Sequence, residues 1–384
     1  MKIVNLLFIL LLSHFCFAQQ PQHIHGFAID KKPNTWYKEQ IALWRAELDK
    51  NPTNSYAWYN YYRSTRNHIR TDVEDKRTPA EKSAQLAALV NAMEKVVPES
   101  FEYNLCKWMD GGNDYEHNLS YLKKAAQLGP ERIEILSEMI VWAEIERDIT
   151  KRDKYSQKWF ESPLLSPGLL YYNYNVLIGL KSNAILITQG DNDTYPIWIL
   201  QSQGIRQDVT VLNTSLLNID SYRTKVFAEL GITKWETTTL NTISDGSQRY
   251  SNELVKHLAS NSKKNQVYIA LTVGEELTKP IAEHLYLTGL AYEYSPTSID
   301  NIALMKKNFE QEYALDYLEK PFYQDISAYW SKHSSKNYIV PMIKLYDHYK
   351  TSGDQARMEW IKKKIVSIVK GSAEEQSTLN YLSK

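Results

Sequence analysis

The hydrophobic positions of the chain change their spacing twice along the sequence. From residue 34 to about residue 160, apolar side chains recur every three or four positions, as on one face of a helix. Between residues 168 and 300, short apolar runs rich in β-branched residues alternate with helical segments, which predicts strands joined by helices. Helical spacing returns from residue 301 to the end. This order predicts an α/β fold in which a Rossmann-like, mostly parallel sheet is flanked on both sides in sequence by α-helical hairpins.

Turn signals and composition give the domain organisation. Two prolines, Pro163 and Pro167, separate the first helical stretch from the sheet-forming stretch. The predicted organisation is a signal peptide at 1–18, a flexible leader at 19–34, a helical-repeat region at 35–165, a Rossmann-like α/β module at 168–300 and a C-terminal helical region at 301–384.

The first helical stretch has one feature of a known repeat. Asn51 and Pro52 form a turn signal, Trp58 follows the proline by six positions, and Tyr61 lies one helical turn further on. This spacing resembles the junction between tetratricopeptide repeats, in which each repeat is a pair of helices. Tyr62 stands where those repeats have a glycine. The resemblance implies stacked helical hairpins that either bind other proteins or brace a neighbouring domain.

The sheet-forming stretch opens with a strand, a loop, a helix and a second strand. An apolar run at residues 184–188 stops at Gly190, and a polar turn follows it. A helical pattern through Trp198 then leads to a second apolar run at residues 209–212. In open sheets with this connection, ligands lie outside the carboxyl ends of the strands. The polar turn after the first strand is therefore the place where we expect a site.

Three further short elements follow along the chain. The pattern predicts a third strand at residues 267–271, a helix at residues 283–287 and an edge strand at residues 290–294. If the first three strands are adjacent and parallel, the polar residues after them converge on one edge of the sheet. The candidate ligand-binding residues are the polar side chains that follow these strands, namely Asp191, Asn192, Asp193, Thr194, Asn213, Ser215, Glu275 and Glu276.

Three interpretations of these residues stay open. They could hold a hard divalent cation such as Ca²⁺ or Mg²⁺, with Asp191 and Asp193 as metal ligands and Glu275 or Glu276 as the general base of an enzyme. The same oxygens could bind the hydroxyls of a sugar without catalysis. Asp193 or Thr194 could instead cap the helix that follows the turn.

Charge, targeting signals and cysteine content narrow the classes of function. The 45 basic and 45 acidic residues balance, so no net field recruits nucleic acid. Lys2 and the apolar residues 3–12 have the form of a secretory signal that is cleaved before Gln19. Export would leave Cys106 as the single thiol, so no internal disulfide is expected. We therefore predict a periplasmic or cell-envelope protein with no nucleic-acid partner and no membrane span after signal cleavage.

Several strings in the sheet-forming stretch resemble a known protein family. One reads Asn-Ala-Ile-Leu from Asn183 and continues as Gly-Asp-Asn-Asp-Thr-Tyr-Pro from Gly190. A second spans residues 208–218, and a later block at residues 268–296 agrees in order and spacing. They resemble the soluble C-terminal region of a family of multi-spanning bacterial membrane proteins of unknown function, which is similar to protein O-mannosyltransferases. The chain departs from the family at residues 265–266, which are Asn-Gln where the family has Arg-Pro.

The resemblance implies a soluble module that accompanies glycosylation in the cell envelope. Such transferases hold their catalytic carboxylates in membrane-embedded segments, and no such segment is expected in this sequence, so transferase activity is not carried over. The leading hypothesis is an exported, non-enzymatic binding or accessory module linked to surface glycans or protein glycosylation. The alternatives are a metal-dependent glycan-processing enzyme and a helical-repeat scaffold that binds envelope proteins.

Overall fold

The computed structural model describes residues 20–115, 117–235, 247–321 and 323–384. The predicted signal peptide at residues 1–18 therefore lies outside the described residues. The chain divides into two compact units, and each is described by itself. The first contains Lys32–Arg132 with the residues up to Phe27, and the second contains Ile133–Lys384 with Ala28–Lys31. No helix in the described ranges is both long and apolar enough to span a bilayer.

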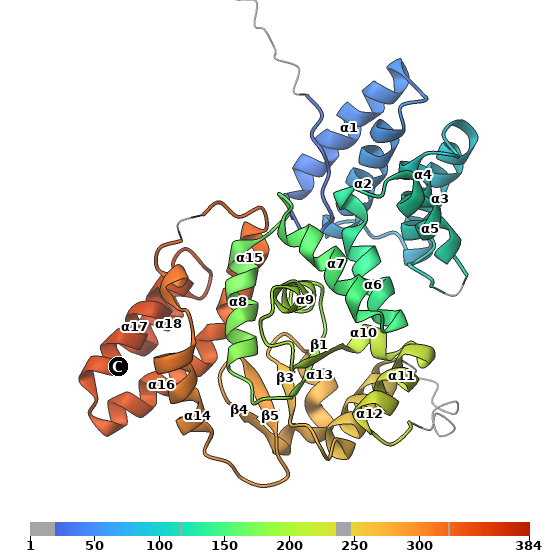
Figure 1. The fold of residues 1–384 in the computed structure, drawn as a ribbon. Helices are drawn as coiled ribbons and strands as arrows, with labels where there is room; N and C mark the ends of the chain where they lie inside the picture. Colours follow the sequence, from blue (N-terminus) through green and yellow to red (C-terminus); the bar gives the residue numbers. More distant parts are fainter. Residues whose placement is uncertain (1–19, 116, 236–246, 322) are drawn as a thin grey trace, which may run out of the picture. The chain divides into compact units, whose positions relative to one another are not determined.

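The first unit is built of helices joined by short turns (Figure 1). The helices are α1 (Asn34–Lys50), α2 (Ser55–Thr71), α3 (Pro79–Val96), α4 (Phe101–Asp110) and α5 (Leu119–Leu128). α1 packs on α2, α3 packs on α4 and α4 packs on α5, while α2 also contacts α3 and α4. The turn at Asn51 and Pro52 lies between α1 and α2, as the sequence predicted.

Polar side chains fix where these helices begin. α2 starts after Asn54, whose side chain accepts a hydrogen bond from the N–H of Ala57 at 3.1 Å. Thr78 and Glu81 bond each other's main-chain N–H groups ahead of α3, which is a capping box. These contacts satisfy amide groups that the first turn of a helix leaves without intrahelical partners. The helix boundaries of this unit are therefore encoded locally.

The second unit contains a five-stranded sheet in the order β2-β1-β3-β5-β4. The strands are β1 (Ile185–Thr188), β2 (Thr210–Asn213), β3 (Val267–Ala270), β4 (Leu285–Leu287) and β5 (Ala291–Tyr294). β1 pairs in parallel with β2 and with β3, whereas the β3–β5 and β5–β4 pairings are antiparallel. The predicted combination of helices with a sheet is confirmed. The sheet is not mostly parallel, because half of its pairings run the other way.

The antiparallel half follows from a hairpin that the sequence pattern did not reveal. Residues 283–287, predicted as a helix, instead contain β4 after a 3₁₀ turn at Lys279–His284. The predicted edge strand at residues 290–294 is β5, which lies between β3 and β4. Gly289 reverses the chain at a φ of 146°, a conformation that favours glycine. The direction of β5 is thus set at this turn.

The helices of the second unit precede, alternate with and follow the strands (Figure 1). They are α6 (Leu136–Glu146), α7 (Ile149–Phe160), α8 (Pro167–Ile178), α9 (Tyr195–Ser202), α10 (Thr214–Leu217), α11 (Asp220–Leu230), α12 (Ser247–Asn261), α13 (Glu275–Thr278), α14 (Asn301–Lys307), α15 (Ala328–Ser335), α16 (Ile339–Ser352), α17 (Gln355–Val369) and α18 (Glu375–Leu382). α7 and α8 pack on α9, and α15 packs on α8. The sheet-forming stretch is therefore enclosed by helices from both ends of this unit.

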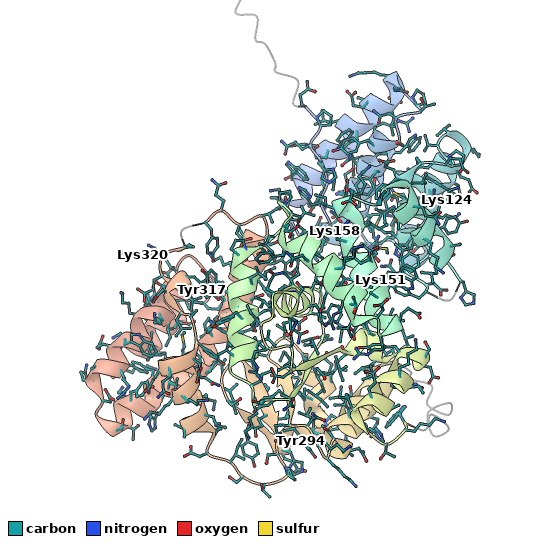
Figure 2. The ribbon with its side chains drawn as sticks, in the orientation of Figure 1. Lys124, Lys151, Lys158, Tyr294, Tyr317 and Lys320 are labelled. Atoms are coloured by element: carbon teal, nitrogen blue, oxygen red, sulfur yellow. The ribbon has the colours of Figure 1, made fainter. Side chains whose placement is uncertain are left out.

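The central strands are buried on both faces, which explains their continuous apolar sequences. All four residues of β1 and all four of β3 are buried, and Trp198 of α9 is fully buried. Full burial of a large apolar side chain stabilises a fold by about 1.5–3 kcal/mol. Aromatic packing extends beyond the sheet, because Tyr171 of α8 stacks on Tyr317, labelled in Figure 2, with ring centroids 4.9 Å apart.

A buried ion network joins α6, α7 and α11. The carboxylate of Glu144 is fully buried and accepts hydrogen bonds from Arg152 Nη1 at 2.9 Å and Tyr222 Oη at 2.8 Å. Arg147 pairs with Glu144 and also with Glu229 of α11, the latter at 2.8 Å. Buried charges are tolerated when their partners satisfy them. The network therefore joins α6 and α7, which precede the sheet in sequence, to α11, which follows β2.

Candidate functional site at the strand ends

The ends of three strands meet at one edge of the sheet. β1 lies between β2 and β3 and runs parallel to both, so the loops after these strands are neighbours. Thr188, the last residue of β1, pairs in register with Asn213, the last residue of β2. The loop that follows β3 contains Thr272 and Gly274. The strand order thus brings together the three loops that carry the predicted site residues.

Asp193 holds the loop after β1 to the loop after β3. It is 4% exposed, and its Oδ1 accepts the N–H of Gly190 at 2.7 Å. Its Oδ2 accepts the N–H of Gln189 at 3.1 Å and the hydroxyl of Thr272. A carboxylate has about four lone-pair sites, so most of its hydrogen-bonding capacity is used inside the protein. We call Asp193 with Gln189, Gly190 and Thr272 the Asp193 clamp.

Two opposing effects act on the pKa of Asp193. Burial disfavours the charged carboxylate and raises its pKa above the ordinary value. The hydrogen bonds from Thr272, Gln189 and Gly190 favour the charged form and act in the opposite direction. The effect of burial is the larger, so the pKa of Asp193 is raised. The donors of the clamp thus offset part of the cost of burying this side chain.

Thr194 and Asn213 join the loop after β1 to the end of β2. The Thr194 hydroxyl donates to the carbonyl of Gly190 at 2.6 Å and lies 2.7 Å from Thr188 Oγ1. Asn213 Nδ2 donates to Thr194 Oγ1 at 3.0 Å, and its Oδ1 accepts the N–H of Ser215 at 2.8 Å. Asn213 therefore caps α10 and braces the β1 loop at the same time.

Two residues of this edge were missed by the sequence analysis. Gln189 spans from the β1 loop to the β3 loop, because its Oε1 accepts the N–H of Gly274 at 2.7 Å. Thr272 binds Asp193 across 79 positions of the chain. Both lie within two residues of a strand end. Both would have been found by taking every polar residue within two positions of a strand end, hydroxyl-bearing residues included.

The remaining predicted residues lie at the surface of this edge. Asp191, Ser215, Glu275 and Glu276 are exposed. Asn192 is half-buried, and its carbonyl accepts a hydrogen bond from Asn173 Nδ2 of α8 at 2.9 Å. The structure thus divides the eight predicted residues into a buried group that builds the edge and an exposed group that faces solvent.

The helix-cap interpretation fails for α9, although the turn is structural. Thr194 occupies the N-cap position of α9, but its side chain makes no hydrogen bond to that helix. Asp193 likewise bonds N–H groups that precede it, in the loop after β1. Across the described ranges, no three His, Cys, Asp or Glu side chains gather in a way that could hold a metal ion. Whether Asp191 and Asp193 bind a cation stays a prediction.

Fold and edge together define a mixed α/β protein with a helical first unit and a preformed polar edge on a partly parallel sheet. A protein-family model described as TMEM260-associated domain 2 matches residues 171–229. The match fits a TMEM260-like family of membrane proteins, and it bears on neither mannosyltransferase activity nor tetratricopeptide repeats. It spans α8 to α11 and so includes the clamp residues other than Thr272. No curated protein matches the chain.

Proposed function

We propose that this protein is exported to the cell envelope and acts there as a non-enzymatic binding module for a surface glycan or a glycosylated protein. In this proposal the parallel half of the sheet is Rossmann-like, and the ligand lies at the carboxyl edge of β2, β1 and β3. The observation that carries the proposal is the Asp193 clamp. It ties the loops after β1 and β3 together and gives the edge one fixed shape.

The clamp favours binding over catalysis. General acid–base and metal catalysis need a carboxylate whose oxygens can reach the reacting group or the ion. The oxygens of Asp193 are instead occupied by main-chain N–H groups and the Thr272 hydroxyl. Glu275 is exposed to solvent, whereas catalysis by a general base is favoured where water is excluded. These features support a site that recognises a polar ligand without transforming it.

The chemistry of the exposed group suits a sugar. A saccharide presents several hydroxyls, each of which can donate to a carboxylate such as Asp191 or Glu275 or accept from a hydroxyl such as Ser215. Because the edge is already ordered, binding would require little further ordering of the protein. The helices of the first unit enter this proposal as tetratricopeptide-like hairpins that dock an envelope protein.

Isothermal titration calorimetry with mannobiose tests the proposal on the full chain. We expect binding that weakens by about tenfold or more in the Asp191→Ala/Glu275→Ala double variant, because hydrogen bonds to charged groups contribute about 1.5–3 kcal/mol each. Glu359→Ala removes an exposed carboxylate from α17 and is the matched control. Absence of mannobiose binding, or binding that the double variant retains, would exclude this edge as a glycan site.

A second titration separates the proposal from the metal-dependent enzyme. The full chain is titrated with CaCl₂ and then incubated with a chromogenic mannoside. Calcium-dependent cleavage that is lost in Glu275→Gln would favour the enzyme. Mannobiose binding that is unchanged by a chelator, without cleavage, would favour the binding module.

A further inference from the structure

The segment before α1 lies against the helix pair α1–α2 of the first unit. Residues 20–26 have no helix or strand structure of their own. Figure 1 shows this segment (dark blue) running alongside α1. We call residues 20–27 the N-terminal strap. Side chains of both helices form hydrogen bonds with the main chain of the strap, in addition to the contacts that its side chains make.

α1 binds the strap through two side chains one helical turn apart. Gln40 Oε1 accepts the N–H of Gln22 at 2.7 Å, and Trp44 Nε1 donates to the carbonyl of Gln22 at 3.0 Å. Gln40 is fully buried. Both main-chain groups of one strap residue are therefore satisfied by side chains of a single helix, as they would be by a neighbouring strand.

α2 continues the same pattern along the strap. Asn60 Oδ1 accepts the N–H of Ile24 at 2.8 Å, and Asn67 Nδ2 donates to the carbonyl of His25 at 3.3 Å. Asn60 and Asn67 are seven positions apart, so they lie on one face of α2. The N–H groups of alternate strap residues, Gln22 and Ile24, thus point at the helices, which is the spacing of an extended chain. Because these amide side chains bond main-chain groups, the same hydrogen bonds can form with extended segments of many different sequences.

Two side chains of the strap add sequence preference. Ile24 is 1% exposed and is the apolar anchor of the strap. The ring of His23 stacks on the rings of Tyr56 and Tyr59 at centroid distances of 5.7 and 5.9 Å. His23 Nδ1 also lies 2.9 Å from Tyr56 Oη. The groove between α1 and α2 therefore fits an extended segment with a ring followed directly by a branched aliphatic side chain.

The strap leaves part of the groove's hydrogen-bonding capacity unused. Gln40 Nε2 and Asn67 Oδ1 are buried and have no hydrogen-bond partner among the described residues. Both atoms belong to amides whose other end bonds the strap. Buried polar atoms are normally paired, so two unpaired ones in a single groove call for an explanation. A peptide that also supplied an acceptor to Gln40 and a donor to Asn67 would bond both amides completely.

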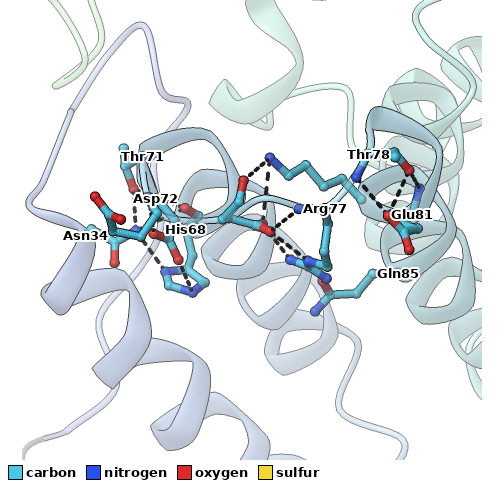
Figure 3. Close-up of polar contacts among 11 residues, drawn as sticks. Asn34, His68, Thr71, Asp72, Arg77, Thr78, Glu81 and Gln85 are labelled. Carbon is cyan, nitrogen blue, oxygen red and sulfur yellow. Dashed lines mark hydrogen bonds and ion pairs between the residues drawn. The ribbon is translucent and has the colours of Figure 1, made fainter.

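The walls of the groove are held together independently of the strap (Figure 3). Asn34, at the start of α1, donates from Nδ2 to the carbonyl of His68 and to Thr71 Oγ1, each at 3.0 Å. Beyond α2, Asp75 bonds Arg77 and holds the turn that leads to α3. α1 and α2 are therefore joined at this end by contacts that do not involve the strap.

We propose that the α1–α2 groove is a peptide-binding site that the N-terminal strap occupies within the same chain. The partner is an extended segment of another protein that carries an aromatic or imidazole side chain followed by a branched aliphatic one. It displaces the strap and pairs with Gln40, Asn60 and Asn67 through its main chain. This site is separate from the strand-end edge of the second unit.

Fluorescence polarisation on the full chain tests this proposal with a labelled synthetic peptide of residues 20–27, Gln-Pro-Gln-His-Ile-His-Gly-Phe. Ile24→Asp in the chain removes the anchor and vacates the groove, so the peptide should bind this variant at least about tenfold more tightly than it binds the unaltered chain. Adding Asn60→Ala should abolish that binding. Gln127→Ala, which removes an exposed amide of α5, is the matched control and should leave it unchanged.

Two outcomes would overturn the proposal. One is equal, weak binding of the peptide by the unaltered chain and by a folded Ile24→Asp variant. The other is a concentration-dependent dimer of the unaltered chain in sedimentation, which would mean that the strap is exchanged with a second copy. If Ile24→Asp does not fold, hydrogen exchange on the unaltered chain decides. The Gln22 and Ile24 amides should exchange at least about tenfold faster than the amides inside α2, and equal protection would make the strap a fixed part of the core.

Discussion

Replacing Asp193 with alanine should destabilise the protein although no bound ligand is involved. The substitution removes the acceptor of the Gln189 and Gly190 N–H groups and of the Thr272 hydroxyl. Asp191→Ala, two positions earlier in the same turn, removes an exposed carboxylate and is the matched control. The two variants have the same change in composition and charge, so their difference reports the clamp.

The size of the effect follows from the number and surroundings of the lost bonds. A hydrogen bond to a charged group contributes about 1.5–3 kcal/mol. The three bonds of the clamp are lost, together with a longer one from Thr194 Oγ1 at 3.3 Å. Gly190 is exposed, so water can replace the hydrogen bond that its N–H loses. The variant also no longer bears the cost of burying a carboxylate, which offsets a further part of the lost stability. We expect a loss of about 3 kcal/mol for Asp193→Ala, and a clearly smaller loss, about 1 kcal/mol or less, for Asp191→Ala, because Asp191 is exposed.

Urea and thermal unfolding, followed by circular dichroism, measure both variants. For a unit of this size, 3 kcal/mol corresponds to a fall in Tm of about 6–12 °C. Thr272→Val removes one donor of the clamp and allows a double-mutant cycle with Asp193→Ala. Because the two side chains are in contact, we expect a coupling energy of about 1–2 kcal/mol.

The reasoning would be refuted by equal losses in Asp193→Ala and Asp191→Ala. It would also be refuted by a coupling energy near zero between Asp193 and Thr272. Either result would mean that the loops after β1 and β3 keep their positions without this carboxylate.

Three further predictions concern other groups. Glu144→Gln should lower stability by about 3–5 kcal/mol in thermal unfolding, because it removes the buried carboxylate that pairs with both Arg152 and Arg147 and leaves them only Asp153 and Glu229 as counter-charges; a loss under about 1 kcal/mol would contradict this. The hydrogen bond from Arg206 lowers the pKa of Asp208 to about 2, so this carboxylate adds stability above its ordinary pKa that is lost as the pH falls toward 2. The Tm difference between the unaltered chain and Asp208→Asn should therefore shrink between about pH 5 and about pH 2, and a constant difference would argue against the pairing. Burial raises the pKa of the Cys106 thiol, so this group should react with Ellman's reagent at about pH 8 only after unfolding in urea; fast reaction in the folded state would show that it is accessible.

Helices and buried strands could be predicted because each leaves a local period in the sequence. The β-branched run at residues 184–188 gave β1, and the turn at Pro52 gave the break between α1 and α2. Residues 283–287 were assigned wrongly because a run of a few apolar residues fits both a helix and a strand. The antiparallel direction of β5 could not be predicted either. It depends on the reversal at Gly289 and on pairing between β3 and β5, which is set by packing far along the chain.

The position of the candidate site could be predicted from the sequence, but not which of its residues are buried. The topology of parallel strands puts polar loops on one edge, and this needed only the strand pattern. Nothing local distinguishes Asp191 from Asp193, since both are acidic residues of one turn. Asp193 is buried because Thr272 and two main-chain amides converge on it, and Thr272 comes from a distant loop. Burial of that kind is a property of the assembled sheet.

The buried network around Glu144 also determines where the chain can be shortened. A fragment that begins at Ile133 keeps Glu144 and Arg152 with Tyr222 and keeps α7 on α9. One that begins at Gly168 would strip Tyr222 of its acceptor and uncover the apolar side of α9 that α7 shields. Expression of the sheet-bearing part on its own should therefore start no later than Ile133.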